Sequence, residues 1–228
     1  MLPGLDGTGA MFRPFLEAAP AGSSIVPRVV RYPDREVRSY VGLEPTVEAS
    51  LPSDRPFVLL GESFGGPLSI RVAARAPTGL RALILVATFA RAPVNPWLSR
   101  LSSLARPALF SIPPPAPFLR QLLVGPDAED ALVEEFQAST TCVHPAVLAA
   151  RVQAVLRVDV REELARCPVP ALYLEANAER LLRRGLSAEL RALKPDLEIA
   201  RVDAPHLLLQ RNPKAAWSSI ESFVRRLS

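Results

Sequence analysis

Apolar and β-branched residues gather in short continuous runs that recur along the chain. The clearest run, Phe57–Leu60, lies between Pro56 and Gly61. A continuous apolar run of this length predicts a strand that is buried on both faces of a sheet. The runs that we interpret as strands are Ser24–Tyr32, Phe57–Leu60, Leu80–Phe89, Pro170–Leu174 and Leu197–Val202.

Longer segments between these runs carry apolar residues at three- and four-residue spacing, which predicts amphipathic helices. Strands that alternate with helices favour a mostly parallel sheet covered on both faces. The right-handed crossover rule then restricts the topology to a doubly wound α/β fold. The predicted helices are Ala10–Ala19, Ser39–Leu51, Gly65–Ala76, Arg180–Leu193 and Pro213–Leu227.

The segment of residues 91–158 interrupts this alternation, because it contains no convincing strand pattern. It is rich in proline around Pro113–Pro115 and then takes a helical period over Ala128–Phe136 and Pro145–Leu156. Long insertions in compact domains are usually functional. We therefore expect one domain over residues 1–228, with a helical cap or lid over residues 91–158, called the insertion segment below. A rigid linker or a polyproline ligand is the alternative interpretation of the proline triplet.

Composition narrows the function classes without selecting one. The chain has 228 residues, of which 49% are hydrophobic and 22% charged, and these values argue against disorder. The 27 basic residues face 23 acidic ones and are spread through the predicted helices, so we expect no nucleic-acid partner. No apolar run approaches the ~18 residues that span a bilayer, so we expect no stable membrane insertion. Two cysteines, Cys142 and Cys167, form neither a disulfide framework nor a metal-binding spacing, which favours a cytoplasmic protein without a metal.

The pentapeptide Gly61-Glu62-Ser63-Phe64-Gly65 has the GxSxG pattern of a serine nucleophile. The pattern alone is weak, but here it follows the apolar run Phe57–Leu60 directly and precedes a predicted helix. This is the strand–turn–helix context that an exposed nucleophilic serine requires. A glycine-rich turn with an incidental serine is the alternative. We take Ser63 as the candidate nucleophile.

A second glycine-rich loop, Leu2–Gly9, precedes the first predicted helix. A phosphate-binding loop is the competing interpretation, but the lysine of the GxxxxGK[ST] pattern is missing. A loop that exposes backbone N–H groups beside the nucleophile stabilises a tetrahedral oxyanion instead. The expected donors are the backbone N–H of Leu5 and that of Phe64, the residue after the nucleophile.

A serine hydroxyl needs a base, and the chain has only two histidines, His144 and His206. In folds with a nucleophile elbow the chain order is serine, then acid, then histidine. His206 satisfies this order, because it follows the last predicted strand. His144 lies within the insertion segment before Pro145 and is most simply a residue at the start of a helix.

The acid that orients the imidazole should lie on the loop after the strand that follows the insertion segment. Glu175 and Glu179 lie there, and no Asp does. Glu179 is the better placed of the two, because Glu175 follows the strand directly and fits a solvated or ion-paired role. Asp159 and Asp203 are the other contenders from position alone.

Together these motifs resemble the α/β-hydrolase superfamily, in particular compact bacterial esterase-like members whose oxyanion loop reads LPGLDGTG. The resemblance covers the whole chain through LPGLDGTG at Leu2–Gly9, GESFGG at Gly61–Gly66, PALYLEANAERLL at Pro170–Leu182 and PHLLLQRNP at Pro205–Pro213. In the third segment Glu179 falls on the position of the catalytic Asp. The resemblance implies hydrolysis of carboxylic esters or thioesters without a cofactor.

One departure from the family concerns the start of the chain. Family members carry a central strand that leads into the oxyanion loop, whereas here the loop begins at Leu2. The fold is therefore expected to be shortened at this end. A gap would leave unpaired backbone groups on a buried strand. We expect Ser24–Tyr32 to pair with Phe57–Leu60 more directly than usual, a neighbouring chain to fill the gap, or the fold to be weakened there.

The sequence thus predicts a serine hydrolase that cleaves a small-molecule ester through an acyl-enzyme, with Ser63, His206 and Glu179 as catalytic residues. A thioesterase or acyltransferase would share these residues. A non-catalytic binding protein that keeps the fold is a further alternative. The apolar stretch Leu98–Leu123 suggests a hydrophobic acyl pocket, although core packing explains it equally well.

Overall fold

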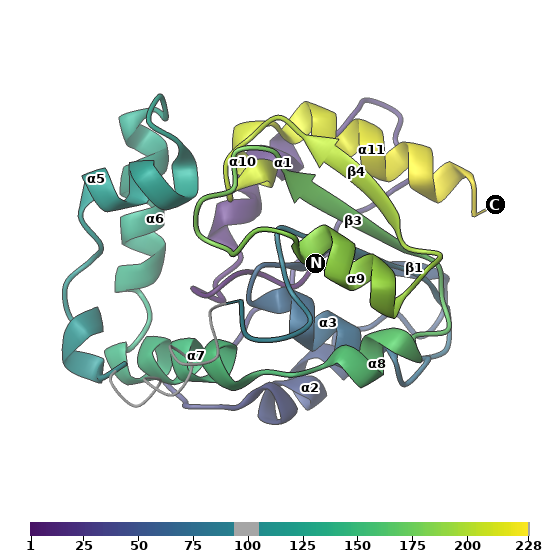
Figure 1. The fold of residues 1–228 in the computed structure, drawn as a ribbon, viewed down its shortest axis with the longest axis horizontal. Helices are drawn as coiled ribbons and strands as arrows, with labels where there is room; N and C mark the ends of the chain where they lie inside the picture. Colours follow the sequence, from purple (N-terminus) through teal and green to yellow (C-terminus); the bar gives the residue numbers. More distant parts are fainter. Residues whose placement is uncertain (94–104, 228) are drawn as a thin grey trace.

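The computed structural model of the chain describes residues 1–93 and 105–227. At its centre is a parallel sheet of four strands in the order β1-β2-β3-β4 (Figure 1). All four strands fall on predicted runs, and the doubly wound α/β fold class is confirmed. The strands are β1 (Phe57–Glu62), β2 (Leu80–Val86), β3 (Ala171–Ala176) and β4 (Glu198–Val202).

Helices cover both faces of the sheet, as the continuous apolar strands require. Along β2, Leu83 and Leu85 pack into the core on one face, while Ala82, Ile84 and Val86 pack into the core on the other. The first face is covered by α2 (Tyr40–Glu48), α3 (Gly65–Ala73), α8 (Arg161–Ala165) and α9 (Leu186–Leu193). The second is covered by the 3-10 helix η1 (Ala10–Phe12) with α1 (Arg13–Glu17), α10 (Leu208–Arg211) and α11 (Pro213–Arg225).

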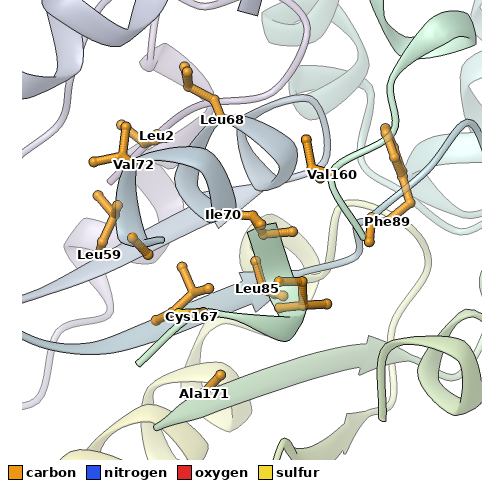
Figure 2. Packing of buried hydrophobic residues seen from close by; sticks show 14 of the residues in the cluster. Leu2, Leu59, Leu68, Ile70, Val72, Leu85, Phe89, Val160, Cys167 and Ala171 are labelled. Atoms are coloured by element: carbon orange, nitrogen blue, oxygen red, sulfur yellow. The ribbon is translucent and has the colours of Figure 1, made fainter. Parts of the chain in front are cut away.

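The two cores are closely packed and dominated by aliphatic side chains. Figure 2 shows the first core, where Leu68, Ile70 and Val72 of α3 lie over Leu59 and Leu85 of the sheet. In the second core an aromatic pair joins the first and last helices. The rings of Phe15 and Trp217 stack with their centroids 4.6 Å apart. The indole N–H of Trp217 also donates a hydrogen bond of 2.6 Å to the Phe15 carbonyl.

The insertion segment is helical where the structure describes it. Figure 1 shows α5 and α6 standing to one side of the sheet, with α7 running below them. The described residues of the segment hold no strand, only an isolated bridge between Arg91 and Asp159 at its edge. Part of the apolar stretch Leu98–Leu123, residues 98–104, lies outside the described residues. The helices are η3 (Pro107–Phe110), α5 (Ala116–Leu119), the π-helix η4 (Arg120–Val124), α6 (Asp130–Thr141) and α7 (Pro145–Arg157).

The expectation that Ser24–Tyr32 pairs directly with β1 is wrong. This stretch forms no strand, and Leu2 occupies the position beside β1 through a parallel bridge to Gly61. The Leu2 N–H donates to the Leu60 carbonyl at 2.7 Å, and the Leu2 carbonyl accepts from the Glu62 N–H at 3.1 Å. Val30 in turn donates to the Met1 carbonyl, so residues 1–2 separate the two segments. Pro27 also removes one backbone donor from the stretch.

The helix predicted over Arg180–Leu193 begins six residues late, at Leu186 rather than Arg180. Residues 177–185 form turns and bends instead. The side chain of Glu179 accepts hydrogen bonds from the N–H groups of Leu181 and Leu182, at 2.8 and 3.1 Å. These bonds satisfy the backbone in a turn and compete with helix formation there.

Candidate functional site

Ser63 lies on a sharp turn between the end of β1 and the start of α3. Its φ of 49° is in the left-handed region, which costs a non-glycine residue about 1–3 kcal/mol. Neighbouring hydrogen bonds hold this conformation. The Ser63 N–H donates to the Val86 carbonyl at 2.9 Å, and its carbonyl accepts from the Thr88 hydroxyl at 2.6 Å. Backbone strain of this kind, at a residue that lies at the C-terminal edge of a parallel sheet, is typical of a nucleophile elbow.

The glycine-rich loop of residues 2–9 lies directly against this turn. A Cβ on Gly65 would come within 2.5 Å of the Leu2 carbonyl oxygen and 2.7 Å of that of Pro3. Only glycine allows the two backbones to approach so closely. A Cβ on Gly4 would lie 3.9 Å from the Cβ of Ser63, so the loop passes Ser63 at van der Waals distance.

His206 lies on the turn between β4 and α10 and reaches Ser63. Its Nε2 is 3.1 Å from the Ser63 Oγ. The imidazole is only 2% exposed, so its orientation is fixed by its surroundings rather than by water. His144 lies elsewhere, at the N-terminus of α7, where its Nδ1 accepts from the Ala146 N–H. The two histidines therefore occupy the positions that the sequence predicts for them.

Glu179 contacts the other imidazole nitrogen. Its Oε2 is 2.6 Å from Nδ1 of His206, while its Oε1 accepts the two N–H bonds from Leu181 and Leu182. Burial alone would raise the pKa of Glu179. The charge and hydrogen bond of His206 and the two backbone N–H groups outweigh burial and lower this pKa. The carboxylate therefore stays ionised where it touches the imidazole.

The other candidate acids have different partners. Glu175 accepts a hydrogen bond from the Ser187 hydroxyl at 2.5 Å and pairs with Arg201 at 3.0 Å. Asp159 pairs with Arg161 at 2.6 Å. Asp203 is exposed, and its backbone carbonyl accepts from Asn212. Of the four acids considered, only Glu179 contacts His206.

The loop of residues 2–8 turns its carbonyl groups into the protein. Each of these carbonyls accepts a hydrogen bond, from the backbone or from the side chains of Arg31, Tyr32 and Arg151. In contrast, within residues 1–93 and 105–227, neither the N–H of Leu5 nor that of Phe64 donates to any acceptor. These are the two N–H groups that the sequence predicts as oxyanion donors.

Two buried residues beside the site, Glu62 and Gln210, are not among the site residues that the sequence predicts. Glu62 is only 3% exposed, and its Oε1 accepts a hydrogen bond of 3.1 Å from Gln210, four residues after His206. Burial raises the pKa of Glu62 to about 7, although the Gln210 hydrogen bond and the charge of His206 oppose the shift. Glu62 stands inside the GxSxG pattern, but no local pattern indicates that its partner lies 148 residues away.

The insertion segment contacts both sides of this site. Leu119 and Val124 pack with Leu207, the residue after His206, and the Leu207 N–H donates to the Leu123 carbonyl at 3.0 Å. At the other side, Val147 packs with Leu5 of the glycine-rich loop. Apolar side chains of the insertion segment therefore border the turn of His206 and the glycine-rich loop of residues 2–9.

A cavity of about 400 Å³ lies behind the loop of Glu179. Its lining includes Tyr173, Glu175 and Arg201 as well as Glu179, whereas neither Ser63 nor His206 contributes. This polar cavity is not the apolar acyl pocket that the sequence suggests.

No group of three or more His, Cys, Asp or Glu side chains in the described part of the chain is arranged to hold a metal ion. Over residues 1–93 and 105–227, no helix combines the length and the apolar character that a membrane span requires.

Comparison with known families identifies one match over nearly the whole chain. The profile described as the alpha/beta hydrolase family matches residues 1–218. Among solved structures, a hydrolase from Oleispira antarctica superposes with a TM-score of 0.74 at 15% identity, over 97% of this chain and 88% of the other. At this identity the likeness concerns the fold alone.

Two characterised relatives are similar in sequence. The N-formylmaleamate deformylase of Pseudomonas putida is 29% identical over 191 residues, which cover 78% of this chain and 64% of the relative. The chloroplastic phytyl ester synthase 1 of Arabidopsis thaliana is 33% identical over 121 residues, 49% of this chain and 17% of the relative. The chain thus spans less than two thirds of the length of either relative.

Proposed function

We propose that this chain, which belongs to the α/β-hydrolase family, is a serine hydrolase that cleaves carboxylic esters through an acyl-enzyme. One observation carries the proposal. A continuous line of hydrogen bonds joins Glu179, His206 and the strained Ser63, with distances of 2.6 and 3.1 Å. Nucleophile, base and orienting acid are within the reach that this chemistry needs.

In the first step His206 takes the Ser63 proton at Nε2 as Oγ attacks the substrate carbonyl carbon. The carbonyl oxygen becomes an oxyanion and is held by the N–H groups of Leu5 and Phe64. Glu179 fixes the tautomer of the imidazole and stabilises its charged form. Collapse of the tetrahedral intermediate breaks the ester bond, and the proton on Nε2 passes to the leaving alcohol.

In the second step water attacks the acyl-enzyme. His206 takes a proton from the water, the oxyanion forms again on the same two N–H groups, and the proton returns to Ser63 as the acid is released. The chemistry needs no cofactor, because each proton and electron pair is transferred between substrate, water and side chains.

We assign the loop LPGLDGTG at Leu2–Gly9 as the oxyanion loop and the insertion segment as the cap of the substrate site. Apolar contacts support this assignment, because side chains of the cap pack against Leu5 of the glycine-rich loop and against Leu207 beside His206. The substrate is a small molecule with an acyl group. Free Cys142 and Cys167 fit a cytoplasmic enzyme.

Acyl transfer to an acceptor other than water is the second candidate. The relative from Arabidopsis thaliana is an ester synthase, and its similarity covers about half of this chain. An acyltransferase would use the same residues and would replace water by an alcohol in the second step. The deformylase relative adds formyl amides to the substrates worth testing.

The test is hydrolysis of p-nitrophenyl esters, acyl-thioesters and a formyl amide by the wild type and Ser63→Ala. We expect the variant to lose about 10⁶-fold in kcat, down to background, because the attacking atom is gone. Ser219→Ala is the matched control, since this serine lies on α11 and bonds only the Ala215 carbonyl. Substantial turnover by Ser63→Ala rejects Ser63 as nucleophile. A folded wild type that cleaves none of these substrates favours a binding protein.

A further inference from the structure

Arg151 is a buried charge in the middle of α7, near the end of the insertion segment. It lies on α7 and is only 2% exposed. No carboxylate in residues 1–93 or 105–227 forms an ion pair with it; its hydrogen bonds go to backbone carbonyls. The charges of Asp6 and Asp34 favour the guanidinium from beyond ion-pair distance, but burial is costly unless its N–H groups are satisfied as well. The carbonyls that accept hydrogen bonds from Arg151 therefore indicate the role of this residue.

Two of the carbonyls that Arg151 binds belong to the oxyanion loop. Its Nη1 donates to the Leu5 carbonyl at 2.9 Å and to the Asp6 carbonyl at 2.7 Å. Leu5 and Asp6 are the central residues of a turn that the Gly7 N–H closes onto the Gly4 carbonyl at 3.1 Å. The Asp6 carbonyl shares its peptide plane with the Gly7 N–H, and the Gly4 carbonyl that this N–H binds shares its plane with the Leu5 N–H. Arg151 therefore acts on the plane of the Leu5 N–H through the closing bond of the turn. The free Leu5 N–H is part of this turn.

The same guanidinium also lies over the second donor residue. Its Cζ is 5.5 Å from the ring centroid of Tyr32 and 5.9 Å from that of Phe64. The two rings meet edge to face, with centroids 5.9 Å apart. A cation over aromatic rings is attracted to them, most strongly where water is excluded. One side chain thus contacts both residues whose N–H groups are the proposed oxyanion donors.

Gly7 makes room for this arrangement. A Cβ on Gly7 would lie 2.6 Å from Nη1 of Arg151 and 2.7 Å from Cδ2 of Tyr32, and its φ is +68°. A glycine in the middle of the loop is therefore required by the arginine that packs against it, as well as by its own backbone conformation.

We propose that Arg151 is a positioning residue of the oxyanion hole, through which the insertion segment sets the direction of the Leu5 N–H. Arginine suits this task because its planar fork donates to several carbonyls at once. The inference rests on the proposed function, since an oxyanion hole has a purpose only if Ser63 attacks a carbonyl. The insertion segment then has two roles: it covers the substrate site, and through Arg151 it holds the backbone of the oxyanion loop.

The test compares Arg151→Met and Arg151→Lys with the wild type on the best ester substrate. We expect Arg151→Met to lower kcat about 10- to 100-fold with little change in KM, because a displaced donor weakens only the transition state. The inhibition constant of a trifluoromethyl ketone, which forms a tetrahedral adduct on the serine, should rise by the same factor. Lysine retains one donor and should recover part of the loss. Gly7→Ala should reproduce the kcat defect.

Arg191→Met is the control. Arg191 also donates to a backbone carbonyl, that of Leu197, but it lies on α9, outside the insertion segment. It should keep kcat within about twofold, because its partner belongs neither to the oxyanion loop nor to the histidine turn.

The possible results distinguish a failure of the proposed role of Arg151 from a failure of the proposed function. If folded Arg151→Met and Arg151→Lys keep the wild-type kcat and ketone affinity, Arg151 is a structural residue only and the inference fails, while the proposed function stands. If Arg151→Met does not fold, the kcat and ketone affinity of Arg151→Lys decide in the same way. A wild type that neither cleaves esters nor binds the ketone overturns the proposed function and the inference together.

Discussion

Glu179 takes a position where aspartate is the usual residue, and its longer side chain is accommodated by the turn that it stabilises. One oxygen contacts the imidazole while the other caps two backbone N–H groups. The carboxylate is therefore anchored at both oxygens.

Removal of this charge tests its role. Glu179→Gln keeps the shape but cannot hold the imidazole in the required tautomer, so we expect kcat to fall about 10³- to 10⁴-fold. Glu175→Gln is the control, because Glu175 bonds Ser187 and Arg201 instead of His206. Steady-state kinetics measure both. A Glu179→Gln variant with more than a tenth of the wild-type kcat contradicts the assignment.

Glu62 makes stability depend on pH. Its pKa rises from 4.5 to about 7 in the fold, so between these values the folded chain holds a proton that the unfolded chain has lost. The free energy of unfolding should therefore fall as pH rises through this window and level off above it. Glu62→Gln should gain up to about 3 kcal/mol over the wild type between pH 4 and pH 8.

Urea unfolding at several pH values measures this effect. Glu134→Gln serves as the control, because Glu134 is exposed on α6. Parallel curves for the wild type and Glu62→Gln across the whole range would show that Glu62 is not the source of the pH dependence.

The residues of the site differ in how far sequence predicts them. Ser63, His206 and Glu179 could be selected because each stands in a recognisable local context or in a fixed chain order. Arg151 could not, since its partners in the loop lie 145 and 146 residues away and a helical arginine ordinarily indicates a solvated surface. Such a contact is set by tertiary packing, which leaves no local pattern.

At the scale of elements, an ion cluster fastens α2 to α3 and α8. Glu44 is buried on α2 and pairs with Arg71 and Arg75 of the α3 region, while Arg71 also reaches Glu163 of α8 at 3.2 Å. A buried carboxylate with two guanidinium partners is stable as a group and costly to break.

Glu44→Gln should therefore lower the free energy of unfolding by about 1–3 kcal/mol, since the two arginines lose their shared partner but keep Glu163 and Glu48. Glu48→Gln is the matched control on the same helix. Its side chain is 43% exposed and pairs only with Arg75, so we expect a change below about 1 kcal/mol. Equal effects in chemical unfolding would show that burial does not distinguish the two pairs.

Elements were predicted best where burial is complete. Strands β1, β2 and β3 contain continuous apolar runs that are buried by packing on both faces. Strand β4 is the last in the sheet order, carries the exposed Glu198 and Arg201, and has the weaker apolar pattern. Ser24–Tyr32 has the composition of a strand, but Leu2 already occupies the position beside β1. A strand-like composition does not indicate with which segment a stretch will pair. The late start of α9 has a local cause, the turn capped by Glu179, which apolar periodicity does not register.

At the scale of the whole molecule, the residues of the proposed active site come from four separate parts of the chain that meet at one end of the sheet. Loops after β1, β3 and β4 supply Ser63, Glu179 and His206, and residues 2–9 supply the oxyanion loop. The parallel order of the strands brings these loops together, as is general for open α/β sheets. The alternation of strands and helices was enough to predict this architecture. The packing of the insertion segment against Leu5 and Leu207 could not be predicted from it.

The central claim is that Ser63 is an activated nucleophile, and covalent labelling tests it most directly. The wild type, Ser63→Ala and His206→Ala are treated with a fluorophosphonate, and the modified peptide is mapped by mass spectrometry. We expect one phosphonyl group on the Ser63 peptide of the wild type, none on Ser63→Ala, and much slower labelling of His206→Ala, which lacks the base. A folded wild type that stays unlabelled, or that carries the label on another residue, would contradict the account.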